Sequence, residues 1–97
     1  MFGFEIQIQL AKEKRREFLQ AFEFLSCKSK ECIGQHLYED LDQDDRFLWT
    51  ERWMNLTALE DHMRSDRFKS LLGAIDVLGE LENLDIVEFR ASPDDVR

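Results

Sequence analysis

The side chains with the clearest potential for chemistry are two tryptophans with a carboxylate between them. Trp49, Glu51 and Trp53 are spaced two residues apart, so in a strand all three point to one face. An indole gives a flat apolar wall for an aromatic ligand, and its N–H can orient an oxygen. Core packing is the alternative, but a carboxylate between two indoles is not expected in a dry core. We therefore expect this face at a cavity, a rim or a subunit interface.

His62 is the first candidate for acid–base chemistry, because imidazole changes charge near neutral pH. It could act as a base or as a hydrogen-bond donor toward a ligand. Alternatively, it could hold its helix on the sheet by bonding a backbone group or a neighbouring carboxylate. The sequence leaves both interpretations open.

Five further polar side chains could take part in a site. Tyr38 could hydrogen-bond a substrate or pair across a hairpin, and His36 on the same face could border a cavity or solvent. Gln7 and Gln9, on the polar face of the first strand, could line the same cavity or bond across a dimer interface. Arg52 could hold an anionic substrate, although a surface salt bridge is the more common role.

Metal sites are not predicted. The Asp40–Asp45 segment has aspartates at alternate positions, as a calcium loop does, but Asp45 stands where that loop needs glycine. Cys27 and Cys32 have the spacing of neither a redox motif nor a zinc half-site. They could approach each other across a helix–strand connection, but two free thiols are the expectation in a reducing compartment.

The elements that must position these residues are read from periodicity and turn signals. Apolar residues alternate along the first strand, and a stripe formed by Phe18, Leu19, Phe22 and Leu25 marks a helix. The expected elements begin with a strand over Phe2–Leu10, a helix from Lys12 to about Cys27, and a strand over Cys32–Glu39, in which Gly34 suggests a bulge or a close approach by another group. A turn over Asp40–Asp45 and a strand over Arg46–Trp53 follow. A helix then opens with a capping box at Thr57–Glu60, is interrupted at Ser65–Asp66 and ends at Gly79, and the last strand covers Leu84–Arg90.

This order predicts an α+β, ferredoxin-like β-α-β-β-α-β sandwich with a four-stranded antiparallel sheet. We expect one domain over residues 1–97, ordered from about 2 to 91. Both helices should cover one face of the sheet. A chain of 97 residues buries only roughly 60–65% of its unfolded surface, so a second subunit is the simplest cover for the other face.

Composition narrows the class of protein. The chain is 43% hydrophobic and 35% charged, which is globular, and its formal net charge is −8. Nucleic-acid binding is not expected, because the basic cluster at 12–16 is interrupted by Glu13 and is typical of a solvated helix face. No apolar run is long enough for a membrane span, and the N-terminal stretch lacks a signal-peptide pattern, so we expect a cytoplasmic protein without a membrane partner.

One stretch resembles the antibiotic biosynthesis monooxygenase family, the dimeric α+β barrels. The likeness is a strand ending in Glu-x-Trp, a helix beginning Ala-Leu-Glu, and then His-x-x-Ser-x-x-Phe, which here are Glu51, Trp53, Ala58, Leu59, Glu60, His62, Ser65 and Phe68. The order of elements agrees over residues 4–90. The family includes cofactor-free oxygenases of quinols or polyketide phenols, haem degraders, isomerases, and members without known activity.

The resemblance implies a homodimer that oxidises a small aromatic, phenolic or quinol-type substrate with dioxygen and no cofactor. His62 would be base or donor at the mouth of a pocket between helix and sheet, with Tyr38 as a second donor. Trp49, Trp53 and Phe68 would be apolar walls, with Gln7 and Arg52 as polar contacts. Residues 69–75 contain no histidine that could ligate haem iron. The alternatives are a non-enzymatic ligand-binding or structural dimer, in which side chains such as Leu48 fill the cavity, and an isomerase or lyase.

Overall fold

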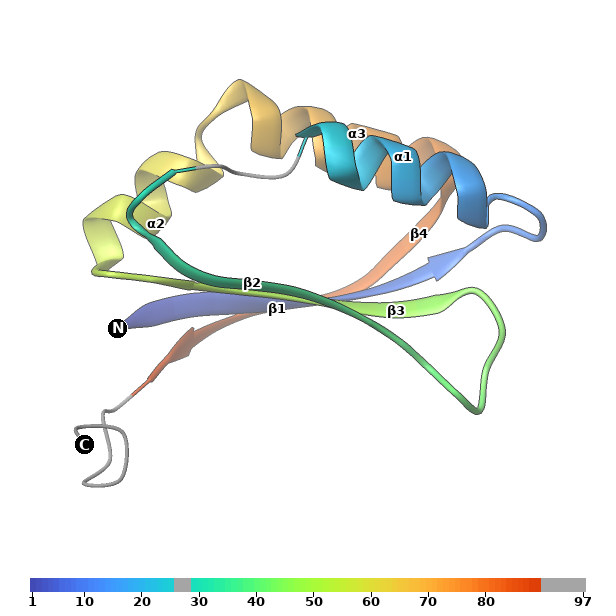
Figure 1. Ribbon diagram of the computed structural model, residues 1–97, viewed down its shortest axis with the longest axis horizontal. Helices are drawn as coiled ribbons and strands as arrows, with labels where there is room; N and C mark the ends of the chain where they lie inside the picture. Colours follow the sequence, from blue (N-terminus) through green and yellow to red (C-terminus); the bar gives the residue numbers. More distant parts are fainter. Residues whose placement is uncertain (26–28, 90–97) are drawn as a thin grey trace.

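A four-stranded antiparallel sheet is covered on one face by three helices (Figure 1). The structure is a computed structural model that describes residues 1–25 and 29–89. Its elements, in chain order, are β1 (Phe2–Leu10), α1 (Arg15–Leu25), β2 (Cys32–Glu39), β3 (Arg46–Trp53), α2 (Leu56–Met63), α3 (Asp66–Leu78) and β4 (Gly79–Glu88).

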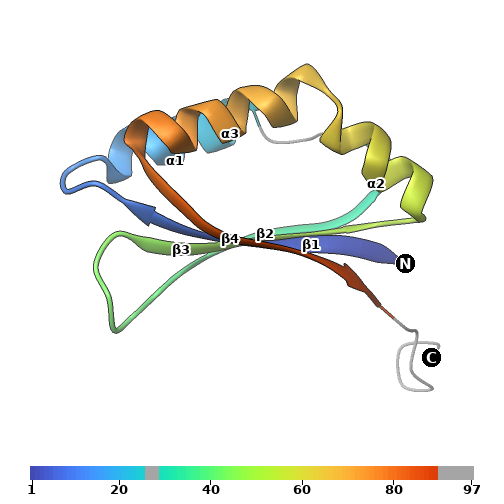
Figure 2. The same cartoon turned by 180° about the vertical axis from the view of Figure 1, so that it is seen from behind.

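The strand order β2-β3-β1-β4 places β1 and β3 in the centre of the sheet. The ferredoxin-like α+β fold predicted from the sequence is therefore confirmed. Seen from behind, all helices again lie on the same side, and the opposite face of the sheet carries no helix (Figure 2). None of the helices in the described part of the chain is long and apolar enough to cross a membrane.

The core lies between the sheet and the helices, on the apolar side of β1. Phe4, Ile6 and Ile8 are fully buried there, whereas the intervening Glu5 and Gln7 are exposed on the helix-free face. This is the alternation that the sequence predicts. From here on, the inner face is the side of the sheet under the helices, and the outer face is the helix-free side.

The first helix begins later than predicted, at Arg15 instead of Lys12. Glu13 has a left-handed backbone with φ of 67°, which an α-helix does not accommodate, so residues 12 and 13 form a turn. The predicted end of this helix near Cys27 lies outside the described residues.

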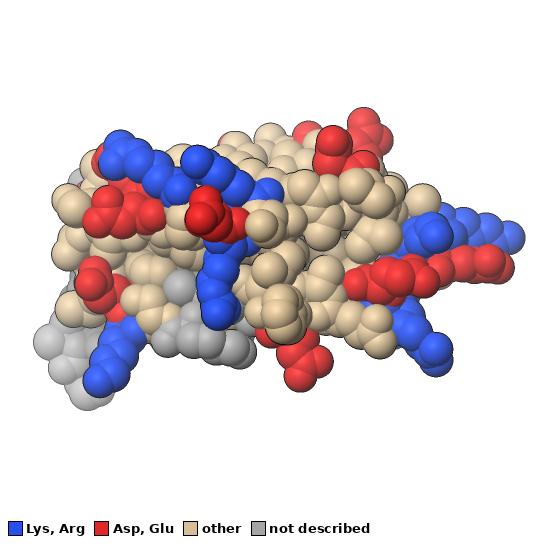
Figure 3. Space-filling view, turned by 90° about the horizontal axis from the view of Figure 1, so that it is seen from above, with Lys and Arg blue, Asp and Glu red and all other residues tan. Residues whose placement is uncertain are grey.

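Seen from the helix side, basic and acidic side chains interleave on the surface (Figure 3). A bidentate ion pair between Arg15 and Glu39 ties α1 to β2, and its hydrogen bonds lower the pKa of Glu39.

The second helical region is divided in two at Ser65, as predicted. The Ser65 hydroxyl donates to the carbonyl of His62 and accepts from the backbone N–H of Phe68, so one side chain ends α2 and caps α3. The predicted capping box at Thr57 is wrong. Asn55 is the N-cap of α2, accepting from Ala58, because its side chain reaches the third helical N–H and leaves Thr57 inside the helix.

The last strand begins at Gly79, five residues before the predicted start at Leu84. A bulge explains the error, since the register slips between the pairs Gln7–Asn83 and Ile8–Leu81 and breaks the period of two. Gly79 is needed there because a Cβ would overlap the carbonyl of Gln9. The strand ends at Glu88, and residues 90–97 are not described.

Of the two explanations for Gly34, the structure supports the bulge, because the β2–β3 register slips between Cys32 and Gly34. Cys27 lies outside the described residues, so the expectation of two free thiols stays a prediction.

Two glycines give a matched test of the helix layer and the sheet. Gly73 is exposed in the middle of α3, and an added Cβ would meet nothing within 4 Å. We expect Gly73→Ala to raise the free energy of unfolding by about 0.5–1 kcal/mol, because alanine loses less backbone entropy in a helix. Gly3→Ala should lower it, since the new Cβ would overlap the carbonyl of Glu51. Urea denaturation measures both, and equal midpoints for the two variants would contradict this packing.

Candidate functional site

The centre of the candidate site is the carboxylate of Glu51 on the inner face of β3. It is only 1% exposed, so the expectation that this face lies at a rim or interface is wrong for Glu51. The indole N–H of Trp53 donates to Oε1 and that of Trp49 donates to Oε2, each over 2.9 Å. The side-chain amide of Gln35 adds a bond of 3.0 Å to Oε2. These three donors replace the water that a buried carboxylate loses.

Local strand geometry explains this arrangement. Trp49 and Trp53 are two residues before and after Glu51 on the same face, so both indoles can lean toward the carboxylate between them. Gln35 joins because it pairs with Glu51 across the β2–β3 ladder. An indole N–H can only donate, so each buried tryptophan needs an acceptor. That requirement is the sequence signal by which Glu51 could have been recognised as a structural acceptor.

His62 lies in the last full turn of α2, directly over this carboxylate. Its Nε2 is 3.1 Å from Oε1 of Glu51, which is the distance of an ion pair. The contact does not meet the geometry of a hydrogen bond, so Nε2 has no hydrogen-bond partner among the described residues. The imidazole stacks on the indole of Trp53, with ring centres 4.5 Å apart and planes at 24°. Its exposed fraction is 7%.

Further aromatic rings pack against His62 and Trp49 in the core. Phe68 meets His62 edge-on at 5.2 Å between ring centres, and Phe4 lies parallel to the imidazole at 6.3 Å. Trp49 is packed between Phe4 and Phe22, each at close to a right angle. Trp49 and Phe68 are thus buried in the core, where they support the site and do not line the pocket described next.

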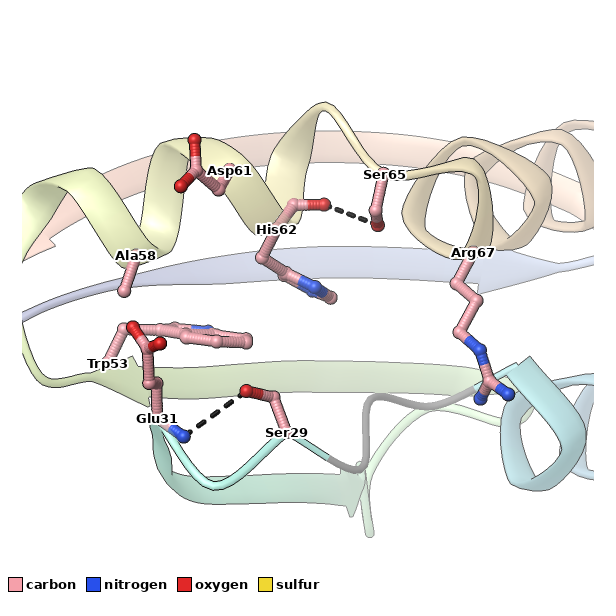
Figure 4. Close-up of a pocket in the computed structure, with 8 residues that line it drawn as sticks. All are labelled: Ser29, Glu31, Trp53, Ala58, Asp61, His62, Ser65 and Arg67. Atoms are coloured by element: carbon pink, nitrogen blue, oxygen red, sulfur yellow. Dashed lines mark hydrogen bonds between the residues drawn. The ribbon is translucent and has the colours of Figure 1, made fainter.

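A pocket of about 270 Å³ opens beside His62 and Trp53 (Figure 4). Its walls come from the segment before β2, the end of β3, α2 and the start of α3. The lining residues are Ser29, Glu31, Trp53, Ala58, Asp61, His62, Ser65 and Arg67. Nε2 of His62 is buried toward Glu51, so Nδ1 is the ring nitrogen through which His62 can act on a ligand. Apart from His62 and Trp53, these lining residues were not predicted.

The remaining predicted residues lie on the outer face. Tyr38 and Arg52 border a separate hollow of about 500 Å³, in which the guanidinium of Arg52 lies 4.3 Å from the ring centre of Phe89. Gln7 borders a third hollow beside Tyr38 and accepts from Arg46. The sheet separates all three residues from His62 within one chain. Leu48, expected as a cavity filler, is also on the outer face.

His36 and Gln9 are the last two of the candidate polar residues. His36 stacks with Tyr38 on the outer face, and Gln9 bonds the carbonyl of Asp44 in the β2–β3 turn. Among residues 1–25 and 29–89, no three His, Cys, Asp or Glu side chains gather closely enough to hold a metal ion.

Comparison with known proteins yields a family match. A family model described as antibiotic biosynthesis monooxygenase matches residues 1–72. An uncharacterised protein of Synechocystis, sll1783, is 34% identical over a match of 64 residues, and the match covers 63% of this chain. The matched region spans 44% of the length of that curated relative.

Solved structures share the fold over nearly the whole chain. A conserved protein from Methanosarcina mazei superimposes with a TM-score of 0.81 at 24% identity, covering 92% of each chain. SnoaB, a cofactor-independent oxygenase from Streptomyces nogalater, gives a TM-score of 0.80 at 15% identity, covering 95% of each chain. At these identities the likeness establishes the fold.

Removing the buried carboxylate should be costly. We expect Glu51→Leu to lower the free energy of unfolding by about 3–5 kcal/mol, because it leaves two indole N–H groups and an amide buried without their acceptor. Glu60→Leu, on the exposed side of α2, is the control and should change it by about 0.5 kcal/mol or less. Chemical denaturation of both variants measures this difference. Similar losses in the free energy of unfolding would contradict the structural role of Glu51.

Proposed function

The chain belongs to the antibiotic biosynthesis monooxygenase family, and on this premise we propose that it oxidises a small phenolic or quinol-type substrate with dioxygen, without a cofactor. The substrate would bind in the pocket beside His62 and Trp53. The observation that carries the proposal is that the imidazole of His62, stacked on the indole of Trp53, lies at the wall of one pocket.

The dimensions and lining of the pocket favour a small aromatic ligand. A cavity of about 150 Å³ can hold one benzene ring, so 270 Å³ suits a one- or two-ring molecule. Trp53 and Ala58 supply apolar surface, while serine and charged side chains surround it. The pocket is slightly smaller than the roughly 300–1,000 Å³ typical of drug-sized ligands, which argues against a large polycyclic substrate.

The proposed chemistry needs a base and an electron-rich substrate. His62 accepts the phenolic proton at Nδ1, and the resulting phenolate passes electrons to dioxygen. In the net reaction of a phenol to a quinone, one oxygen atom becomes the new ring carbonyl. The other oxygen leaves as water with the two hydrogens that the substrate loses. The substrate supplies all four electrons, so no external reductant is required.

A binding module without catalysis is the alternative, and one observation favours it. In the described part of the chain, the space between helices and sheet is filled by side chains such as Phe4, Trp49 and Phe68, and the pocket lies at its edge. Such a protein would bind the same small aromatic molecules without consuming oxygen.

Oxygen uptake tests the catalytic proposal. Metal-stripped protein is incubated with a panel of hydroquinones, naphthols and simple phenols in an oxygen electrode. We expect uptake above autoxidation, and a loss of about 100-fold or more in His62→Gln, because general-base catalysis contributes about that much.

The matched control is Glu60→Gln, a substitution on the exposed side of the same helix, which should retain wild-type uptake. Thermal shift with the same panel accompanies the assay. Stabilisation by a ligand without oxygen uptake would support the binding module instead.

We also propose that two copies pack through their outer faces. This face is free of helices in Figures 1 and 2, and it carries Arg46 and Arg52 on β3 but Glu5 and Asp85 on β1 and β4. Such a charge pattern can complement a second copy of itself. Tyr38, Arg52 and Gln7 would then lie at the interface. The role of Tyr38 as a second donor, the substrate contacts of Arg52 and Gln7, and a cytoplasmic location stay predictions.

Sedimentation equilibrium tests the dimer. We expect twice the chain mass of 11.6 kDa at micromolar concentration, and a shift toward one chain mass in Thr50→Arg, at the centre of the outer face. Ser70→Arg, exposed on α3, is the control and should leave the mass unchanged. A wild-type mass of one chain would overturn the dimer.

A further inference from the structure

We propose that Glu51 is a positioning residue that keeps the imidazole proton of neutral His62 on Nε2, so that Nδ1 is a bare acceptor at the pocket. The use of Nδ1 as a base rests on the proposed function. The location of the proton does not, because it follows from contacts within this chain.

The first argument is the position of the carboxylate. Oε1 of Glu51 lies 3.1 Å from Nε2 of His62, and both side chains are at least 95% buried. A lone pair on Nε2 would face a negatively charged oxygen at this distance, which is repulsive. A proton on Nε2 turns the same contact into an attraction, and water does not screen it. The geometry therefore favours the Nε2–H tautomer even without a directed hydrogen bond.

The second argument is that Glu51 cannot turn away from His62. Its carboxylate is held at both oxygens, by Trp53 on Oε1 and by Trp49 and Gln35 on Oε2. Both indoles can only donate, so each carboxylate oxygen must accept a bond. The bond from Trp53 therefore keeps the oxygen that faces His62 in place.

The other charged groups near His62 lie on its pocket side. Asp61 and Arg67 line the pocket from α2 and α3, and Glu31 lines it from the segment before β2. All three are exposed, so solvent screens them, and they are of mixed sign. The fully buried charge against the ring is Glu51.

The arrangement also determines where a substrate proton would go. With the proton on Nε2, the lone pair of Nδ1 is directed away from Glu51 and can accept a proton from a ligand hydroxyl. The imidazolium formed would carry its new N–H on Nδ1 at the pocket and its original N–H on Nε2 beside Glu51, whose negative charge balances the cation. Glu51 therefore acts through His62 and does not touch the ligand.

Long-range ¹⁵N–¹H NMR of the full chain tests the tautomer directly. At a pH where the His62 ring is neutral, we expect it to show a single tautomer with the proton on Nε2. Free histidine in the same buffer is the reference, and it should show the mixture of a solvated imidazole. A wild-type His62 with its proton on Nδ1 would overturn the proposal, and this measurement needs no variant to fold.

Glu51→Gln supplies the second test. An amide nitrogen beside Nε2 would favour the opposite tautomer, so a population with the proton on Nδ1 should appear. Gln35→Leu is the matched control, because it removes a donor from Oε2 and leaves Oε1 and the carboxylate charge in place. It should keep the wild-type tautomer, even if its melting temperature falls. The same change of tautomer in both variants would indicate general loosening and would overturn a specific role of Glu51.

Kinetics separates this inference from the proposed function. If a substrate is found, Glu51→Gln should lower kcat at least tenfold with little change in KM, since Glu51 lies outside the pocket lining. A rise in KM with unchanged kcat would contradict positioning. If no compound is turned over but His62 has its proton on Nε2, the proposed function fails and the positioning role of Glu51 stands.

Discussion

The buried carboxylate of Glu51 is the interaction on which the inner half of the molecule depends. It is the common acceptor for two indoles and an amide, and His62 lies against the same oxygen as Trp53. A carboxylate buried alone would be strongly unfavourable, and so would two buried indole N–H groups without acceptors. Together they satisfy one another, which allows a charged group to lie at the centre of an aromatic core.

This interaction connects the sheet to the helix layer. Trp53 provides the surface on which His62 stacks, and the hydroxyl of Ser65 ends α2 at the carbonyl of His62. The imidazole is thus held by a strand, a carboxylate and a helix end at once. Rings held in this way lose little entropy when a ligand binds, which suits either catalysis or recognition.

The sheet also divides the polar residues into two groups. The pocket beside His62 is on the inner face, whereas Tyr38, Arg52 and Gln7 border hollows on the outer face. The chain belongs to the antibiotic biosynthesis monooxygenase family, and its fold matches that of a cofactor-independent oxygenase. The family assignment by itself leaves the ligand open, because one scaffold supports many chemistries. The volume of the pocket beside His62 is the basis for proposing a ligand of one or two rings.

The sequence by itself determined the order of elements, the buried face of β1 and the division of the helices at Ser65, because periodicity and capping are local. It also placed Trp49, Glu51 and Trp53 on one face. Only the tertiary structure decided that this face is the core, since alternation assigns residues to faces without labelling the faces. The separation of Tyr38 from His62 depends on the β2–β3 register, and the pairing of His62 with Glu51 depends on how α2 lies over β3. Both are contacts between residues distant in sequence, which no local pattern encodes.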